Sequence, residues 1–258
     1  MKYNTDINII GSIPNYNLIY RYLPLLIDGD KEIYQRLVTE NEYNFRTEKS
    51  RKRFLSALSS AFISNSNTLN EIARKTLSYF DKDEKSQALI IFWLFSINNR
   101  LFFELNRDVF FKNFYQGRAE LPRYEVEAYL KDLIHNNAEL KGRWSEKTVQ
   151  TIASKYLTLM KKLFLLEGSS KKTFCFVHLN DELLAIFIHI YLARKNWSLN
   201  LFDDDFTIFS FVTNDALVER LKKIGKKNWI KMNYTGTSLK VESVFDPNNI
   251  TDGIFRRS

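Results

Sequence analysis

The chain has 258 residues and a formal net charge of +8, and 45% of its residues are hydrophobic. Its one cysteine, Cys175, excludes an internal disulfide and a cysteine-based zinc site, and we expect it to be a buried small side chain. Eight Gly and four Pro are few for this length, which disfavours an all-β or low-complexity chain and favours long helices. The N-terminal segment lacks the apolar run of a secretory signal, so we expect a cytoplasmic protein.

Apolar residues recur with helical spacing from about residue 15 to residue 225. Helices are expected at 15–27, 30–40, 47–63, 67–80, 84–104, 106–115, 123–136, 145–166, 180–195, 203–211 and 214–225. Pro24 is expected to kink or end the first of them.

The C-terminal part changes character after residue 228. Two short segments, 229–234 and 239–244, alternate in part between apolar and polar residues around a Gly-containing turn, which predicts a β-hairpin. A basic helix followed directly by a hairpin is the element order of a winged helix-turn-helix, although the same order occurs in folds that bind nothing.

These elements predict a mainly α fold of two packed helical subdomains with helix-turn-helix or winged-helix-like elements and a short C-terminal β-hairpin. We place the boundary near residue 141. The N-terminal subdomain, 1–140, would carry the basic helix 47–63, and the C-terminal subdomain, 141–258, would end in the winged-helix-like hairpin.

The run ALIIFWLFSI at 88–97 resembles a membrane segment. It is shorter than the roughly 20 residues needed to cross a bilayer. Arg100 and Glu104 follow closely, and both would be costly in lipid. We therefore expect a buried core helix and no membrane insertion.

The positive charge is concentrated in three segments. Residues 45–62 hold five basic and one acidic residue, residues 141–172 hold eight and two, and residues 219–231 hold six and one. Together they carry +15, which leaves −7 on the rest of the chain. Such clustering is typical of a surface that binds a polyanion, although solvated faces are often rich in lysine without any partner.

The sequence TEKS at 47–50 returns as SEKT at 145–148, and a shift of 98 residues also aligns the apolar positions that follow. Thr47 and Ser145 are suitable helix N-caps, with Phe45 and Trp144 placed to pack just outside each helix. The pattern is compatible with an internal duplication and equally with two ordinary well-capped helices.

Neither explanation accounts for the basic residues behind the first cap. Cations cost a few tenths of a kcal/mol each at the positive end of a helix dipole, roughly 0.3–1 kcal/mol at most. A phosphate reverses that cost, because backbone N–H groups and basic side chains converge on it. We therefore interpret the start of helix 47–63 as a phosphate-contacting element.

Residues suited to catalysis or metal binding are sparse. His135, His178 and His189 are far apart, and His189 is expected to be a hydrogen-bonded core residue. The run Asp203–Asp205 is interpreted as a helix start and not as a metal site. Phosphate-binding glycine loops and nucleophile motifs are absent from the sequence, so we expect no enzyme, no cofactor and no metal.

The chain resembles the BrxA proteins of BREX phage-resistance systems over roughly residues 15–245. The resemblance lies in the helical layout, the TEKS and WSEKT helix openings, and the run from Phe206 through LVERL at 217–221 to WIKM at 229–232. The chain departs from the family pattern in having fewer Arg and more Lys, Asn and Phe. The resemblance implies a non-catalytic, cytoplasmic component that binds double-stranded DNA and acts beside a methyltransferase, an ATPase and a phosphatase-like protein.

Sequence and resemblance together predict largely sequence-independent binding of duplex DNA through phosphates. The expected contact residues are Lys49, Arg51, Lys52, Arg53, Arg143, Lys147, Lys222, Lys223, Lys226, Lys227 and Lys231. One alternative is a protein-interaction scaffold that docks an acidic partner in a defence complex without binding DNA. Another is peripheral attachment to an anionic membrane surface.

Overall fold

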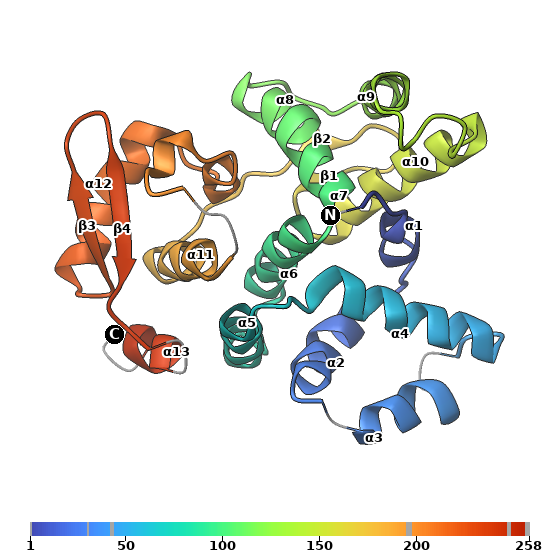
Figure 1. Cartoon of the computed structure of the whole chain (residues 1–258), viewed down its shortest axis with the longest axis horizontal. Helices are drawn as coiled ribbons and strands as arrows, with labels where there is room; N and C mark the ends of the chain where they lie inside the picture. The colour runs from blue at the N-terminus through green and yellow to red at the C-terminus, as the bar shows by residue number, and fades with distance from the viewer. Residues whose placement is uncertain (1, 30, 42–43, 195–197, 247–248, 256–258) are drawn as a thin grey trace. The chain divides into compact units, whose positions relative to one another are not determined.

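The computed structural model describes the chain except for residues 1, 30, 42–43, 195–197, 247–248 and 256–258, and it is mainly helical, as predicted (Figure 1). In chain order the first elements are α1 Asp6–Ile10, α2 Asn17–Ile27, α3 Lys31–Tyr34, the π-helical η1 Gln35–Thr39, α4 Glu48–Phe62, α5 Asn67–Tyr79, α6 Glu84–Asn98, α7 Arg100–Leu105, the π-helical η2 Asn106–Phe110 and α8 Phe111–Tyr115. They are followed by α9 Arg123–Asn136, α10 Glu146–Lys162, β1 Leu166–Glu167, β2 Thr173–Phe174, α11 Asp181–Ala193, the 3₁₀ turns η3 Leu201–Asp203 and η4 Thr207–Ser210, α12 Asn214–Lys226, β3 Ile230–Tyr234, β4 Leu239–Ser243 and α13 Ile250–Phe255.

Contacts group the chain into two compact units, each built from two separate stretches. The first unit is Met1–Ile63 with Leu94–Phe176, and the second is Ser64–Trp93 with Val177–Ser258. The boundary therefore falls inside α6. This grouping of contacts differs from the division into 1–140 and 141–258 that the sequence predicts. That division, as a statement about folding units, stays a prediction.

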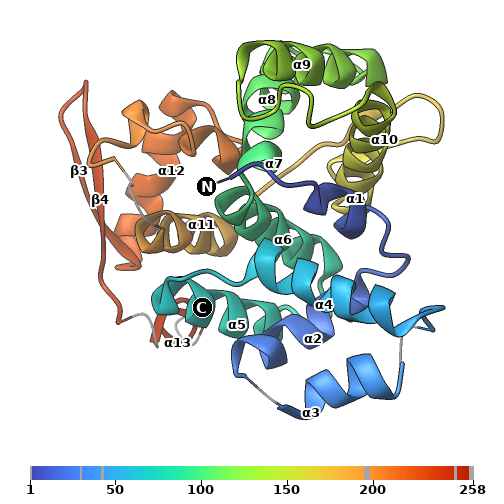
Figure 2. The same ribbon diagram turned by 45° about the vertical axis from the view of Figure 1, so that its right-hand side comes forward.

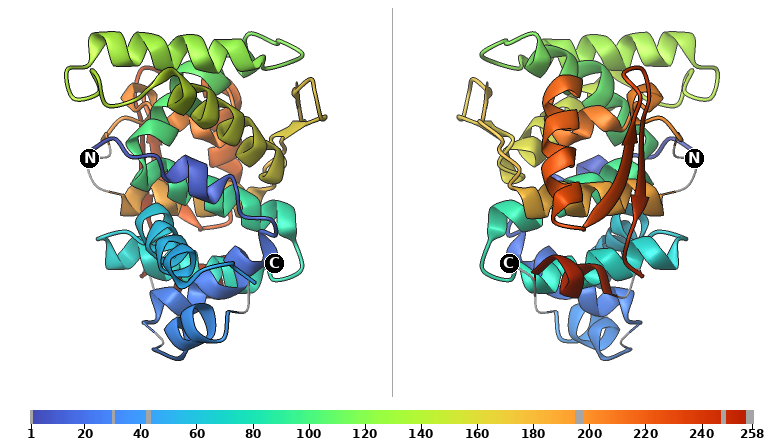
Figure 3. Two further views of the ribbon diagram at one scale, coloured as in Figure 1. Left: turned by 90° about the vertical axis from the view of Figure 1, so that its right-hand side faces the viewer. Right: turned by 90° about the vertical axis from the view of Figure 1, so that its left-hand side faces the viewer.

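In the first unit α1 packs on both α4 and α10, and α9 packs against α10 (Figure 2). In the second unit α11 packs on α5, α12 and α13, and the β3–β4 hairpin lies beside α12 (Figure 3). The hairpin confirms the prediction for residues 229–244: its strands are antiparallel, with Ile230 opposite Ser243 and Tyr234 opposite Leu239.

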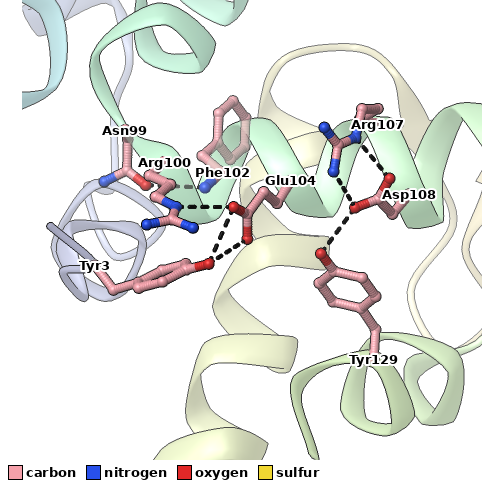
Figure 4. A network of polar contacts seen from close by, with 8 residues as sticks. All are labelled: Tyr3, Asn99, Arg100, Phe102, Glu104, Arg107, Asp108 and Tyr129. Atoms are coloured by element: carbon pink, nitrogen blue, oxygen red, sulfur yellow. Dashed lines mark hydrogen bonds and ion pairs between the residues drawn. The ribbon is translucent and has the colours of Figure 1, made fainter. Parts of the chain in front are cut away.

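Polar contacts tie the N-terminal segment and α9 to the helices that follow α6 in the first unit (Figure 4). The hydroxyl of Tyr3 donates to the carboxylate of Glu104 at 2.8 Å, and Arg100 Nε donates to the same carboxylate at 2.9 Å. Burial raises the pKa of Tyr3 to about 12, and the hydrogen bond to Glu104 adds to that rise. One helical turn further on, Tyr129 of α9 donates to Asp108 at 2.9 Å.

The single helix expected at 84–104 is wrong, because the chain breaks at Asn99. The side chain of Asn99 accepts from the backbone N–H of Phe102 at 2.9 Å and so caps a new helix. The helical stretch Arg100–Tyr115 meets α6 at 113°. Asn99 is buried, and the cap gives its side-chain oxygen a hydrogen-bond partner, which a buried polar group needs.

Residues 89–95 of α6 are buried, which agrees with the predicted core helix. Among the described residues no single helix is long and apolar enough to cross a membrane. By length and composition alone, the bent pair formed by α6 and Arg100–Tyr115 meets that requirement.

Two further expectations need correction. The helix predicted at 203–211 is replaced by two 3₁₀ turns separated by residues 204–206, and the second turn is followed by Phe211 in the left-handed region, with φ 57°. The helix predicted to reach residue 166 stops at Lys162, where Phe164 (φ 58°) turns the chain into β1. α2 contains Pro24 and ends at Ile27, the last residue of the helix expected at 15–27, and whether Pro24 kinks it stays a prediction. The short helices α1 and α13 and the β1–β2 pair were not expected.

Candidate nucleic-acid interface

The two matching sequences fold into matching helix openings in the first unit. Thr47 Oγ1 accepts from the backbone N–H of Ser50 at 3.2 Å, and the two hydroxyls are 2.9 Å apart. Ser145 Oγ accepts from the backbone N–H of Thr148 at 3.3 Å, with the two hydroxyls 3.0 Å apart. Both predicted N-caps are therefore confirmed, and whether they arose by duplication stays a prediction.

The aromatic residues outside the two caps behave differently. The ring of Phe45 packs on Phe54 of its own helix with centroids 5.1 Å apart. The ring of Trp144 instead meets Tyr3 edge-on at 6.4 Å. The contact of Phe45 with its own helix is the one that the sequence predicts, whereas the described ring contact of Trp144 is to the N-terminal segment.

The four basic residues at the start of α4 have different surroundings. Lys49, Lys52 and Arg53 are exposed, whereas Arg51 is half-buried, and within the described residues its Nε has no hydrogen-bond partner. Lys52 Nζ lies 2.5 Å from Glu48 Oε1, one turn earlier. Burial raises the pKa of Asp6 on α1, and the nearby charge of Arg53 opposes that rise.

In the second basic segment, Arg143 and Lys147 are both exposed, on either side of the Ser145 cap. Farther along, Lys162 takes a structural part: its ammonium donates to the backbone carbonyls of Gly11 and Ile13. Burial lowers the pKa of Lys162, and the neighbouring charge of Lys155 lowers it further. In this segment Arg143 and Lys147 thus present exposed charges near the cap, whereas Lys162 connects the end of α10 to the loop after α1.

The β1–β2 turn adds a small basic cavity of about 340 Å³ against α9 and α10. Its charged lining residues are Glu120, Arg123, Lys171 and Lys172, and four hydroxyl residues also line it: Ser154, Thr158, Ser169 and Ser170. Lys172 is already bound to backbone, since its ammonium donates to the carbonyl of Gly168 at 2.8 Å. Burial lowers the pKa of Lys172, as does the charge of Lys161.

The third basic segment forms a groove in the second unit, between α12 and β3. The groove has a volume of about 580 Å³. Its lining residues are Glu219, Lys222, Lys223, Gly225, Lys226, Asn228, Ile230, Lys231 and Met232. Four of the predicted DNA-contacting lysines, Lys222, Lys223, Lys226 and Lys231, therefore line one groove. Of the described residues that line it, only Glu219 is acidic.

The exposed face of α12 follows from its helical phase. Leu217, Leu221 and Ile224 are buried, and at 100° per residue this places Lys222, Lys223 and Lys226 on the outer side. Lys222 Nζ lies 2.7 Å from Glu219 Oε1, and this contact is the main reason that the pKa of Glu219 is lowered.

Lys227 lies apart from the groove. Its Nζ is 2.9 Å from Asp181 Oδ2 on α11 and 4.5 Å from the centre of the buried Trp229 ring. Arg220 joins the same junction, 3.9 Å from Asp181 Oδ1, and its guanidinium donates to the carbonyl of Leu179. The structure thus groups Lys222, Lys223, Lys226 and Lys231 and separates Lys227 from them.

Sequence reasoning missed the apolar side of the groove. Ile230 and Met232 line its floor, and Tyr234, 42% exposed, follows on the same face of β3. The Tyr234 ring centre lies 5.9 Å from Lys222 Nζ. The alternation of β3 contains the signal, but only the pairing of α12 with the hairpin shows which face meets the lysines.

The predicted core histidine is confirmed: His189 is 2% exposed, with Nε2 3.2 Å from the carbonyl oxygen of Trp229. His135 and His178 are exposed. Asp204 binds the side chains of Tyr191 and Arg194, and the described residues contain no group of three or more possible metal ligands. Cys175 is only half-buried, against expectation, because it lies just beyond the short strand β2.

Comparison with known proteins gives one family. No curated protein and no solved structure matches the chain significantly. The family model of BrxA matches residues 23–189, which include α4, both capped helix openings and most of α11. Because the match covers more than half of the 258 residues, the chain belongs to the BrxA family, whose membership implies a component of a BREX defence system.

Proposed function

We propose that this BrxA-family protein binds double-stranded DNA through its phosphates, with little sequence preference, as its part in BREX defence. The observation that carries the proposal is the groove of the second unit, where four lysines converge with a single carboxylate among the described lining residues. Proteins of the family are generally non-catalytic, which fits a binding role. A methyltransferase, an ATPase and a phosphatase-like protein are the proposed partners in the system.

In this proposal α12 and the β3–β4 hairpin act as a winged-helix-like element. The outer face of α12 carries Lys222, Lys223 and Lys226, while the opposite face is buried. A helix presented in this way can enter the major groove, with the hairpin beside it contacting the backbone. The outward-facing lysines supply charge and no base-reading pattern, so affinity would be largely independent of sequence.

The capped openings of α4 and α10 are the proposed contacts of the first unit. The positive end of a helix dipole favours an anion, and exposed Lys49, Arg53, Arg143 and Lys147 flank the two openings. Arg51 adds a buried Nε without a hydrogen-bond partner in the described residues, and Lys52 would exchange Glu48 for phosphate.

Fluorescence anisotropy with a labelled duplex in a salt series tests the proposal. Each phosphate contact contributes about −0.9 to the slope of log K against log salt, so six to ten contacts cost about a thousand-fold or more between 50 and 200 mM salt. Lys223→Glu with Lys226→Glu should weaken binding to every duplex sequence alike. Reversal of exposed Lys82 and Lys85, before and at the start of α6, is the control with the same charge change.

Three outcomes would contradict the proposal. Absence of duplex binding at low salt, together with recovery of a stable acidic partner, would favour the protein-interaction scaffold. Equal weakening by the Lys82/Lys85 control would mean that net charge, and not the α12 face, governs binding. Binding to anionic vesicles with no duplex affinity would instead indicate membrane attachment.

A further inference from the structure

The α12–β3 groove combines positive charge with an apolar floor, and phosphate contacts account for the charge alone. Phosphates bind to donors and cations, yet Ile230 and Met232 line the same hollow as the four lysines. Met232 is half-exposed, and Gly225 of α12 opposite has no side chain. A Cβ at Gly225 would come 3.8 Å from Met232 Cγ, so the missing side chain keeps the floor open.

An aromatic ring continues this apolar surface. Tyr234 follows Met232 on the same face of β3, two residues or about 7 Å further on. The ring is 42% exposed and stands edge-on to Phe202 at 6.3 Å, with Lys222 Nζ 5.9 Å from its centre. The ring is thus held by neighbours while nearly half of its surface meets solvent.

A basic track interleaved with an exposed aromatic ring is the combination that binds unpaired nucleobases. Lysines follow the backbone, and bases stack on aromatic and apolar side chains whatever their sequence. In an intact duplex the base faces are covered by their neighbours, so such a surface gains contact only where pairing is opened.

We infer that the groove between α12 and β3, with Met232 and Tyr234, binds exposed bases, so that the protein prefers locally opened DNA to an intact duplex. The inference rests on the proposed function, which supplies the phosphate contacts around the groove. Opening of the duplex then adds stacking on Tyr234 to contacts that the lysines already make.

The test compares three labelled probes of equal length at one salt concentration: a full duplex, a duplex with a central mismatched bubble, and a single strand. The wild-type protein should bind the bubble about ten-fold more tightly than the duplex, as expected for one stacked base. Tyr234→Ala should remove that preference, so that the bubble and the duplex bind with similar affinity. Tyr234→Phe, which keeps the ring, should retain it.

Matched controls separate this role from charge and from folding. Tyr124→Ala removes a ring that is 68% exposed on α9 of the first unit, and it should leave the preference intact. Lys226→Ala should weaken bubble and duplex binding by the same factor. A 2-aminopurine base in the bubble should be quenched by wild-type protein and not by Tyr234→Ala, with circular dichroism confirming that the variant is folded.

The outcomes distinguish this inference from the proposed function. If no probe binds, both are wrong. If duplex binding is salt-dependent but the bubble gives no advantage, or if Tyr234→Ala weakens all probes equally, the proposed function stands and the inference is overturned.

Discussion

The ammonium of Lys227 lies 2.9 Å from the carboxylate of Asp181, so one of the five predicted contact lysines of the third basic segment is bound within the protein. Because this pair is partly exposed, it adds little stability, about 0–1 kcal/mol. Its consequence is for binding: a lysine neutralised by Asp181 has less charge to offer a phosphate than Lys226, its neighbour on the groove.

We therefore predict different salt dependences for the two neighbours. Lys226→Ala should reduce the slope of log K against log salt by about 1, the value for one phosphate contact. Lys227→Ala should leave the slope unchanged, and Asp181→Asn with Lys227 intact should raise duplex affinity. Equal slopes for the two lysine variants would show that the ion pair with Asp181 opens on binding.

The two helix caps make a prediction about stability. Thr47→Ala and Ser145→Ala each remove an acceptor for a backbone N–H, at 3.2 Å and 3.3 Å, and should cost about 1 kcal/mol apiece. Denaturant unfolding measures the cost. Thr47→Ser and Ser145→Thr should be close to wild type, because the hydroxyl stays.

Ser56 provides the matched control for the caps. It is an exposed serine in the middle of α4, where Ser56→Ala should be neutral or slightly stabilising, since alanine has the better helix propensity. A cost at Ser56 equal to that at Thr47 would contradict the capping argument.

Local chemistry explains which parts of this structure could be predicted from the sequence. The caps at Thr47 and Ser145 and the β3–β4 hairpin depend on neighbours within a few residues, and both were predicted. The helix break at Asn99 depends on the side chain of that one residue, which caps the next helix. Hydrophobic periodicity does not predict it, because the apolar pattern continues on both sides of Asn99.

The candidate site shows the same division between local and distant effects. The separation of Lys226 from Lys227 follows from the 100° step between successive helical residues and could have been inferred from the buried Leu217 and Leu221. The partner of Lys227 could not, because Asp181 is 46 residues away. The role of Tyr234 likewise depends on the packing of β3 beside α12.

Asp204 supports a prediction about the loop between α11 and α12. Burial alone would raise the pKa of its carboxyl, but N–H donors of Ser198 and Phe206 and the Arg194 guanidinium outweigh burial and hold the pKa below its ordinary value. Asp204→Ala would leave the Arg194 guanidinium, whose side chain is only 13% exposed, without its carboxylate partner. We expect a loss of about 3 kcal/mol, because the remaining charge is unpaired.

Thermal or denaturant unfolding near neutral pH tests this expectation, and Asp81→Ala, at an exposed residue between α5 and α6, is the control with an expected loss below about 0.5 kcal/mol. Since the folded-state pKa of Asp204 is depressed, its contribution is present above the unfolded value and is lost as the pH falls through the folded one. If Asp204→Ala were as mild as Asp81→Ala, the loop would not depend on this carboxylate.

The lowered pKa of buried His189 leads to a prediction of how the stability of the second unit depends on pH. Burial lowers its pKa from 6.5 to about 4, although the hydrogen bond to Trp229 partly opposes that shift. Between these values the unfolded chain binds a proton that the folded chain excludes, so stability is full above pH 6.5 and falls as the pH is lowered toward 4. The difference corresponds to about 3 kcal/mol at most.

His189→Gln, which can still donate to the Trp229 carbonyl, should remove this part of the pH dependence, while replacement of exposed His135 and His178 by glutamine should leave it. Urea unfolding at pH 7.5, 6, 5 and 4.5 measures how the free energy of unfolding changes with pH. Subtracting the values of His189→Gln from those of the wild type removes the contribution of the carboxylates, which both proteins share. Parallel slopes for wild type and His189→Gln would mean that the imidazole gains its proton without unfolding the core around Trp229.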